Sequence, residues 1–244
     1  MQDVLIGSIV SALATGLGAL PIVLMKVVTH RWRDILLAFT AGIMVAATVF
    51  NLIPVALDHS NLLTVTIGIL LGTIVLSVME RNMPHIDLEH SKSSAVQFDR
   101  KSMLIITAIT LHNLPEGLSV GVSYASESSG LGPLIALAIG LQNAPEGFLV
   151  ALFLVTQKVK KWHAFAIATL TGTVEIVTGL LGYFLTSYVS NLVPYGLAFA
   201  AGAMLFVVYK ELIPESHGDG NESASTFSFI FGLITMIALI EWFG

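Results

Sequence analysis

Eight long apolar runs constrain what this chain can fold into. Each run is close to the length that a helix needs to cross a hydrocarbon core about 30 Å thick. None alternates with a period of two, so a β-barrel is a poor alternative. Only 11% of the residues are charged, against about 25% in soluble domains. We therefore expect an all-α membrane protein of eight transmembrane helices, over Val4–Met25, Ile35–Leu57, Leu62–Met79, Met103–Tyr124, Leu131–Thr156, Trp162–Val189, Leu192–Tyr209 and Phe227–Phe243.

The chain is expected to form one transmembrane transport domain over residues 1–244, with a single extended loop at about residues 80–101. In an eight-helix threading all 11 Lys and Arg residues fall on one side: Lys26, Arg31, Arg33, Arg81, Lys92, Arg100, Lys101, Lys158, Lys160, Lys161 and Lys210. The positive-inside rule makes this side cytoplasmic and places both termini outside. The basic residues form no stripe, so we expect no nucleic-acid partner. The chain has no cysteine, so it has neither disulfides nor thiolate ligands.

An internal repeat indicates how the helices are arranged. Ala-Gly-Ile-Met at 41–44 and Leu-Ile-Pro at 52–54 match Ala-Gly-Ala-Met at 201–204 and Leu-Ile-Pro at 212–214, at a constant offset of 160 residues. The two copies lie in the second and seventh helices, which run in opposite directions. We therefore predict inverted repeats, helices 1–3 and 6–8, around a central pair formed by helices 4 and 5. Such repeats are typical of secondary transporters.

Two related hexapeptides lie within the central pair: His-Asn-Leu-Pro-Glu-Gly at 112–117 and Gln-Asn-Ala-Pro-Glu-Gly at 142–147. An acidic side chain at the centre of a bilayer costs about 3 kcal/mol on insertion scales. His112 and Glu116 are four residues apart and so share one helix face, and Gln142 and Glu146 repeat this spacing. The pattern predicts that both helices present metal-binding groups at one depth.

The other residues of the hexapeptides support this interpretation. Asn113 and Asn143 are rotated by about 100° from the first face, toward a neighbouring site. Each proline leaves a backbone carbonyl without its usual donor. Gly117 and Gly147 are expected to allow a close approach between helices.

A third carboxylate, Glu175, lies in the middle of the sixth helix. No Lys or Arg occurs between Ser102 and Gln157, or between Trp162 and Tyr209. Buried acids without a basic partner must be protonated, hydrated or bound to a cation. A divalent metal resolves this conflict most directly. One His with several oxygen ligands and no thiolate suits Zn²⁺, Mn²⁺, Fe²⁺ or Co²⁺ and disfavours Cu(I).

The paired hexapeptides resemble the fourth and fifth helices of ZIP divalent-metal transporters. The second motif begins with Gln, and in this it is most similar to the bacterial GufA-type branch. The resemblance extends over nearly the whole chain, including the paired Ala-Gly-x-Met segments and Glu-Leu-Ile-Pro-Glu-Ser-His at 211–217. It implies uptake of Zn²⁺, or of Fe²⁺, Mn²⁺, Co²⁺ or Cd²⁺, into the cytoplasm. It also implies a homodimer in a bacterial inner membrane and an elevator-like motion of helices 1, 4, 5 and 6.

The resemblance also implies particular ligands. The first metal site would consist of His112, Glu116, Gln142 and Glu146. An adjoining second site would consist of Asn113, Glu116, Glu146 and Glu175. Asn143 stands where the branch commonly has Asp, and this removes one charge from the second site. Glu211, and more weakly Glu215 and His217, would belong to an inner exit path, although Lys210 stands where the family often has His.

Several alternatives remain at this point. The hexapeptides could be polar notches that only pack helices, or the three acids could relay protons for another substrate. Glu175 could be a protonated acid that donates to a carbonyl. His85, Asp87, Glu89 and His90 could form a cytoplasmic metal-sensing cluster or a merely polar loop. The chain has no His-Glu-x-x-His motif and no phosphate-binding loop, so we expect neither an enzyme nor a nucleotide-driven pump.

Overall fold

The computed structural model describes residues 1–24, 30–81, 95–126, 130–217 and 220–243, and every regular element in these ranges is helical. The long helices and their extensions are α1 (Gln2–Ala19), α2 (Pro21–Leu24), α3 (His30–Ala47), α4 (Ile53–Asp58), α5 (Leu62–Arg81), α6 (Ala95–Ala125), α7 (Leu131–Thr156), α8 (Lys161–Tyr188), α9 (Val193–Val207), α10 (Ile213–Glu215) and α11 (Glu222–Phe243). Two π-helical turns, Thr48–Leu52 and Val208–Leu212, connect α3 to α4 and α9 to α10, and a 3₁₀ turn, Ser190–Leu192, precedes α9.

Seven of the helical stretches in the described ranges are long and apolar enough to cross a membrane, so the chain is an integral membrane protein. Within the described residues each of the eight predicted runs overlaps a helix, and the run Met103–Tyr124 lies within α6. The run at 131–156 matches α7 residue for residue.

The loop predicted at residues 80–101 is too long at both ends. Helix α5 continues to Arg81, and α6 begins at Ala95, eight residues before the apolar run that predicted it. A helix need not stop where its apolar residues stop, because backbone hydrogen bonds continue through polar residues outside the hydrocarbon core. The sensing cluster considered at His85–His90 lies outside the described residues.

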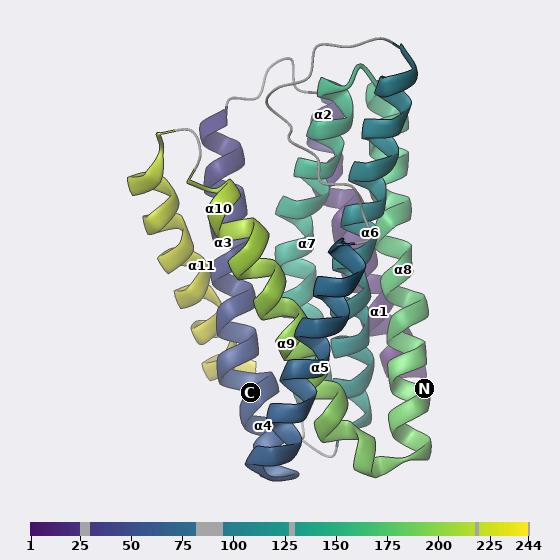
Figure 1. Cartoon of the computed structure of the whole chain (residues 1–244), viewed down its shortest axis with the longest axis vertical. Helices are drawn as coiled ribbons and strands as arrows, with labels where there is room; N and C mark the ends of the chain where they lie inside the picture. Colours follow the sequence, from purple (N-terminus) through teal and green to yellow (C-terminus); the bar gives the residue numbers. More distant parts are fainter. Residues whose placement is uncertain (25–29, 82–94, 127–129, 218–219, 244) are drawn as a thin grey trace.

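The helices associate in two groups (Figure 1). Helices α1, α6, α7 and α8 pack mainly against one another, while α3 pairs with α11 and α5 with α9. Glycines bring the backbones together, as predicted for Gly117 and Gly147. A Cβ at Gly147 would collide with the Thr15 carbonyl oxygen of α1, and a Cβ at Gly117 would collide with Thr178 of α8. The candidate site lies within the first group because α6, α7 and α8 carry its residues.

The two π-helical turns occur at positions 160 residues apart, the same offset as the sequence repeat. Each is followed by the proline of a Leu-Ile-Pro segment, Pro54 or Pro214. A proline cannot donate the next helical hydrogen bond, and its ring crowds the carbonyl of the preceding turn. The wider turn relieves this crowding, and π turns of this kind are frequent at functional sites.

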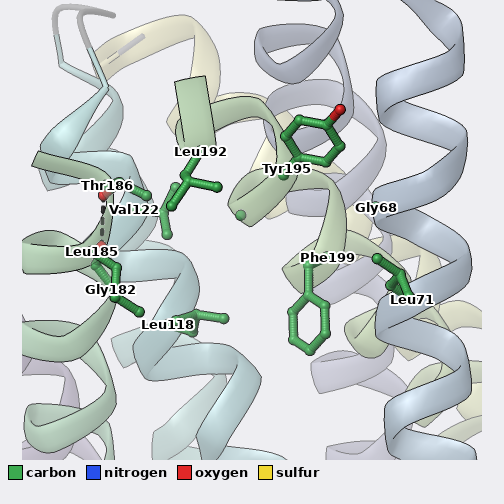
Figure 2. A pocket seen from close by; sticks show the side chains of 11 residues that line it. Gly68, Leu71, Leu118, Val122, Gly182, Leu185, Thr186, Leu192, Tyr195 and Phe199 are labelled. Atoms are coloured by element: carbon green, nitrogen blue, oxygen red, sulfur yellow. Dashed lines mark hydrogen bonds between the residues drawn. The ribbon is translucent and has the colours of Figure 1, made fainter. Parts of the chain in front are cut away.

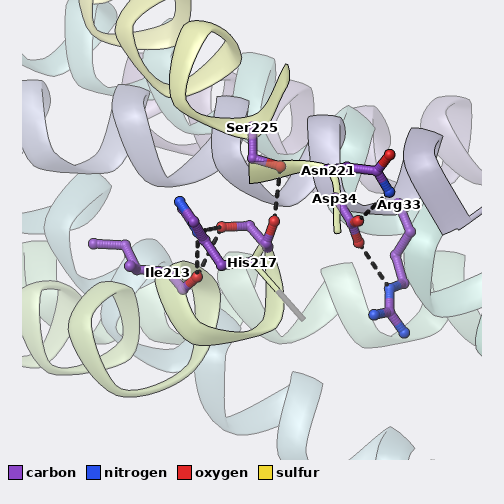
Figure 3. Close-up of polar contacts among 7 residues, drawn as sticks. Arg33, Asp34, Ile213, His217, Asn221 and Ser225 are labelled. Atoms are coloured by element: carbon purple, nitrogen blue, oxygen red, sulfur yellow. Dashed lines mark hydrogen bonds and ion pairs between the residues drawn. The ribbon is translucent and has the colours of Figure 1, made fainter. Parts of the chain in front are cut away.

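The two chain termini lie toward the same end of the helical bundle (Figure 1). The other end carries the beginning of α3, which contains Arg33, and the beginning of α8, whose first residue is Lys161. At this end polar side chains join α3 to the segments around α10 and α11, as Figure 3 shows. Asn221 donates to the buried carboxylate of Asp34 at 2.9 Å, and Ser225 donates to the Ser216 carbonyl at 2.7 Å. The first bond joins α3 to the residue before α11, and the second joins α11 to the residue after α10.

Candidate metal site

The first hexapeptide and the second meet in the space between α6 and α7. Glu116 and Gln142 are buried, and the Gln142 amide Nε2 donates a hydrogen bond to Oε1 of Glu116. Helical spacing had predicted that each residue faces inward, and the structure adds that they face each other. This bond joins the carboxylate of one motif to the leading residue of the other.

Several buried polar atoms in this space have no hydrogen-bond partner. Among them are Glu116 Oε2, Gln142 Oε1 and Asn143 Oδ1, which are all acceptors, and Asn113 Nδ2, which is a donor. A buried polar atom left unsatisfied costs about 1–3 kcal/mol, so native structures rarely keep one without a reason. One carboxylate oxygen and two amide oxygens without partners are ligand atoms of the kind that hard and borderline divalent cations prefer.

Glu175 has a different environment from Glu116. Asn143 Nδ2 lies 2.8 Å and 2.9 Å from the two Glu175 oxygens, and Ser11 Oγ of α1 donates to Oε2 at 2.5 Å. Neither oxygen of Glu175 is left without a partner. The sequence reasoning missed Ser11, although Ser8, Ser11 and Thr15 recur at helical spacing on α1 and mark a small polar face toward the bundle.

Among the described residues no hydrogen bond or ion pair joins His112 to the other predicted ligands of the first site. Its Nε2 lies 2.9 Å from Glu211 Oε2, on the π-helical turn after α9. The side chains are 15% and 34% exposed. Glu146 is close enough for its charge to act on His112, Glu116 and Glu175. The predicted residues thus gather in one region, but His112 pairs with the predicted exit-path residue Glu211.

No three His, Asp or Glu side chains in the described ranges come close enough together to hold a metal ion between them. The physical reason lies in the pairings above. The imidazole pairs with Glu211, and the third acid pairs with an amide and a hydroxyl. Metal coordination here would therefore require His112 to leave Glu211, or would use the oxygens of Gln142 and Asn143 beside those of the acids.

Lys210 does not stand free beside Glu211. Its Nζ lies 3.0 Å and 3.1 Å from the two carboxylate oxygens of Glu80, at the end of α5. It also lies 5.7 Å from the ring centroid of Phe206. His217, the weaker candidate for the exit path, is 3.0 Å from the Ile213 carbonyl through Nδ1. Met44 and Met204 are buried in the apolar core.

A separate cavity of about 230 Å³ lies between α5, α6, α8 and α9 (Figure 2). Leu71, Leu118, Val122, Leu185 and Phe199 give it an apolar wall, and the Thr186 hydroxyl is already bonded to the Gly182 carbonyl. It offers no ligand atoms for an ion. It lies where α6 and α8 of one helix group face α5 and α9 of the other.

Comparisons with known proteins agree with these features. The family model described as ZIP Zinc transporter matches residues 82–240. The chain is 37% identical to the zinc transporter GufA of Myxococcus xanthus, over 96% of each chain. It is 33% identical to the zinc transporter ZIPB of Bordetella bronchiseptica, over 93% of this chain and 76% of that one. It is 42% identical to human ZIP11 over 57% of this chain and 43% of ZIP11.

The fold and these comparisons therefore define a helical membrane protein of the transporter class. The chain belongs to the ZIP zinc transporter family.

Proposed function

We propose that this protein carries divalent metal ions, Zn²⁺ foremost, across the membrane into the cytoplasm. The ion binds at a centre formed by His112, Glu116, Gln142 and Glu146, with Asn113, Asn143 and Glu175 lining the same space. Fe²⁺, Mn²⁺, Co²⁺ and Cd²⁺ are further candidate substrates. The relatives named above are zinc transporters, which supports the ion class.

One observation carries the proposal: Glu116 Oε2 and Gln142 Oε1 are both buried without a hydrogen-bond partner. They lie on neighbouring helices in stretches that contain no Lys or Arg. A packing notch would use its polar atoms to bond the helices together, whereas these oxygens are left available. A passing divalent cation would satisfy both atoms and neutralise the carboxylate.

We also propose that transport is elevator-like, with α1, α6, α7 and α8 moving against the remaining helices. The tight packing within this group supports the proposal, as does the apolar cavity on its border with α5 and α9. The equally spaced π turns support inverted repeats among eight transmembrane spans. A homodimer in a bacterial inner membrane, with both termini outside, completes the proposed arrangement.

The experiment is radiometal uptake into proteoliposomes that contain the purified protein. The wild-type protein should take up ⁶⁵Zn²⁺ with saturation, and Glu116→Ala or Glu146→Ala should abolish uptake while the protein remains folded in detergent. Glu222→Ala, an exposed acid at the start of α11, is the matched control and should transport normally. A protein that moves protons but gives no saturable zinc signal would instead favour the proton-relay alternative.

A further inference from the structure

The region where a second metal ion would sit is already filled by the chain's own donors. Asn143 Nδ2 lies within 3.2 Å of four oxygens: the Ser11 carbonyl, the Ser11 hydroxyl and both carboxylate oxygens of Glu175. Ser11 Oγ adds a bond of 2.5 Å to the same carboxylate. Ser11 is on α1, Asn143 on α7 and Glu175 on α8, so three helices meet at this cluster.

The orientation of the Asn143 amide follows from the chemistry of its neighbours. The Ser11 carbonyl can only accept hydrogen bonds, and Glu175 Oε2 accepts one from Ser11 Oγ. If the amide were flipped, its oxygen would face these two acceptors and would be repelled. The NH₂ group must therefore point at Glu175, and it occupies the place that a cation would take beside this carboxylate.

We infer that the metal centre holds one ion per protomer, because the Asn143 amide and the Ser11 hydroxyl replace a second cation at Glu175. The inference rests on the proposed function. It assigns Ser11 and Asn143 as positioning residues, which hold Glu175 and anchor α1 to α7 and α8. Glu175 then holds α1 and α7 in place beside the site through its hydrogen bonds to Ser11 and Asn143, and it is not a ligand of the ion.

The contrast between two buried acids in the same space supports this assignment. Both are almost completely buried, at 1% exposure for Glu116 and 0% for Glu175. Glu116 keeps one oxygen without a partner, whereas both oxygens of Glu175 are bonded. A carboxylate that is already satisfied gains little from a cation and loses its existing bonds when it coordinates one. An ion therefore binds beside Glu116 in preference to Glu175.

The test is the zinc stoichiometry of the purified full-length protein, measured by equilibrium dialysis with Zn²⁺ and elemental analysis. The wild-type protein should bind one tight zinc ion per protomer. Asn143→Asp replaces the donor amide by a second acid and should bind two. Ser8→Ala should still bind one, because Ser8 lies on the same helix with a hydroxyl that has no partner. Two ions on the wild-type protein, or only one on a folded Asn143→Asp variant, would overturn the inference.

A second variant keeps the test decisive if Asn143→Asp does not fold. Glu175→Gln has nearly the same shape and should retain one zinc ion per protomer, whereas Glu116→Gln should lose it. Loss of the ion from Glu175→Gln would make Glu175 a ligand and would refute the inference. Zinc uptake by the wild-type protein with two bound ions would refute only the single-ion centre, whereas no binding and no uptake would refute the proposed function itself.

Discussion

His112 Nε2 lies 2.9 Å from Glu211 Oε2, and this contact joins the first hexapeptide on α6 to the π-helical turn after α9. The two residues belong to the two different helix groups. In the proposed mechanism an arriving ion competes with Glu211 for the imidazole. The contact is therefore a latch between the groups that binding must open.

Replacing Glu211 by Gln should weaken this latch. A hydrogen bond that involves a charged group contributes about 1.5–3 kcal/mol, and a Gln would retain part of it. Since about 1.4 kcal/mol corresponds to a tenfold change in affinity, the KM for zinc should fall by about threefold to tenfold. The maximal rate should also fall, because an acid on the exit path is lost. Concentration-dependent uptake measures both, and an unchanged KM in Glu211→Gln would rule the latch out.

The close approach of α7 to α1 can be tested at one glycine. Gly147→Ala would drive a methyl group into the backbone carbonyl of Thr15, which cannot move without shifting α1. We expect a loss of about 1–3 kcal/mol in unfolding free energy. Gly140→Ala, on the same helix, is the control, because its new Cβ would lie an ordinary 3.7 Å from Ala14 Cβ. Thermal unfolding in detergent should separate the two variants, and equal stability would contradict the packing.

Lys210 should influence transport more than stability. Its ion pair with Glu80 has side chains 49% and 21% exposed, and exposed pairs contribute only about 0–1 kcal/mol. Lys210→Gln should leave the unfolding midpoint almost unchanged. It should raise the maximal uptake rate by about twofold to fivefold, because a cation beside Glu211 repels the departing ion.

The control for this substitution is ionic strength. The Debye length shrinks to about 3 Å at 1 M salt, so the difference between Lys210→Gln and the wild-type protein should largely disappear there. Lys160→Gln, an exposed lysine at the start of α8, should have no such effect. A rate difference that survives high salt would mean that Lys210 acts through structure rather than charge.

The proposed orientation can be measured directly, because the chain has no cysteine of its own. Tyr188→Cys places a thiol at the end of α8, where the side chain is 84% exposed. Lys160→Cys places one at the opposite end of the same helix. In intact cells a membrane-impermeant maleimide should label the first variant only, and should label the second after lysis. The reverse pattern would invert the topology.

Much of the fold could be predicted from the order of residues alone. The apolar runs predict the helices because hydrocarbon requires about 20 apolar residues and internal backbone hydrogen bonds, whatever the neighbours are. The glycines of the hexapeptides predict close helix contacts, and the structure confirms both. Helix ends were predicted less well, as at Ala95, because a helix can continue into polar sequence.

For the site, the sequence predicts which residues face the interior of the bundle, but not which residues they contact there. The spacing of His112 and Glu116 places them on one helix face, but helical periodicity does not say which helix lies opposite. Only the tertiary structure brings Glu211 to His112, Gln142 to Glu116, and Ser11 together with Asn143 to Glu175. These partners are far apart in sequence, and hydrogen-bond geometry across packed helices selects them. The local sequence therefore determined the helices and their polar faces. The packing of the helices decided that both Glu175 oxygens have hydrogen-bond partners and that one Glu116 oxygen has none.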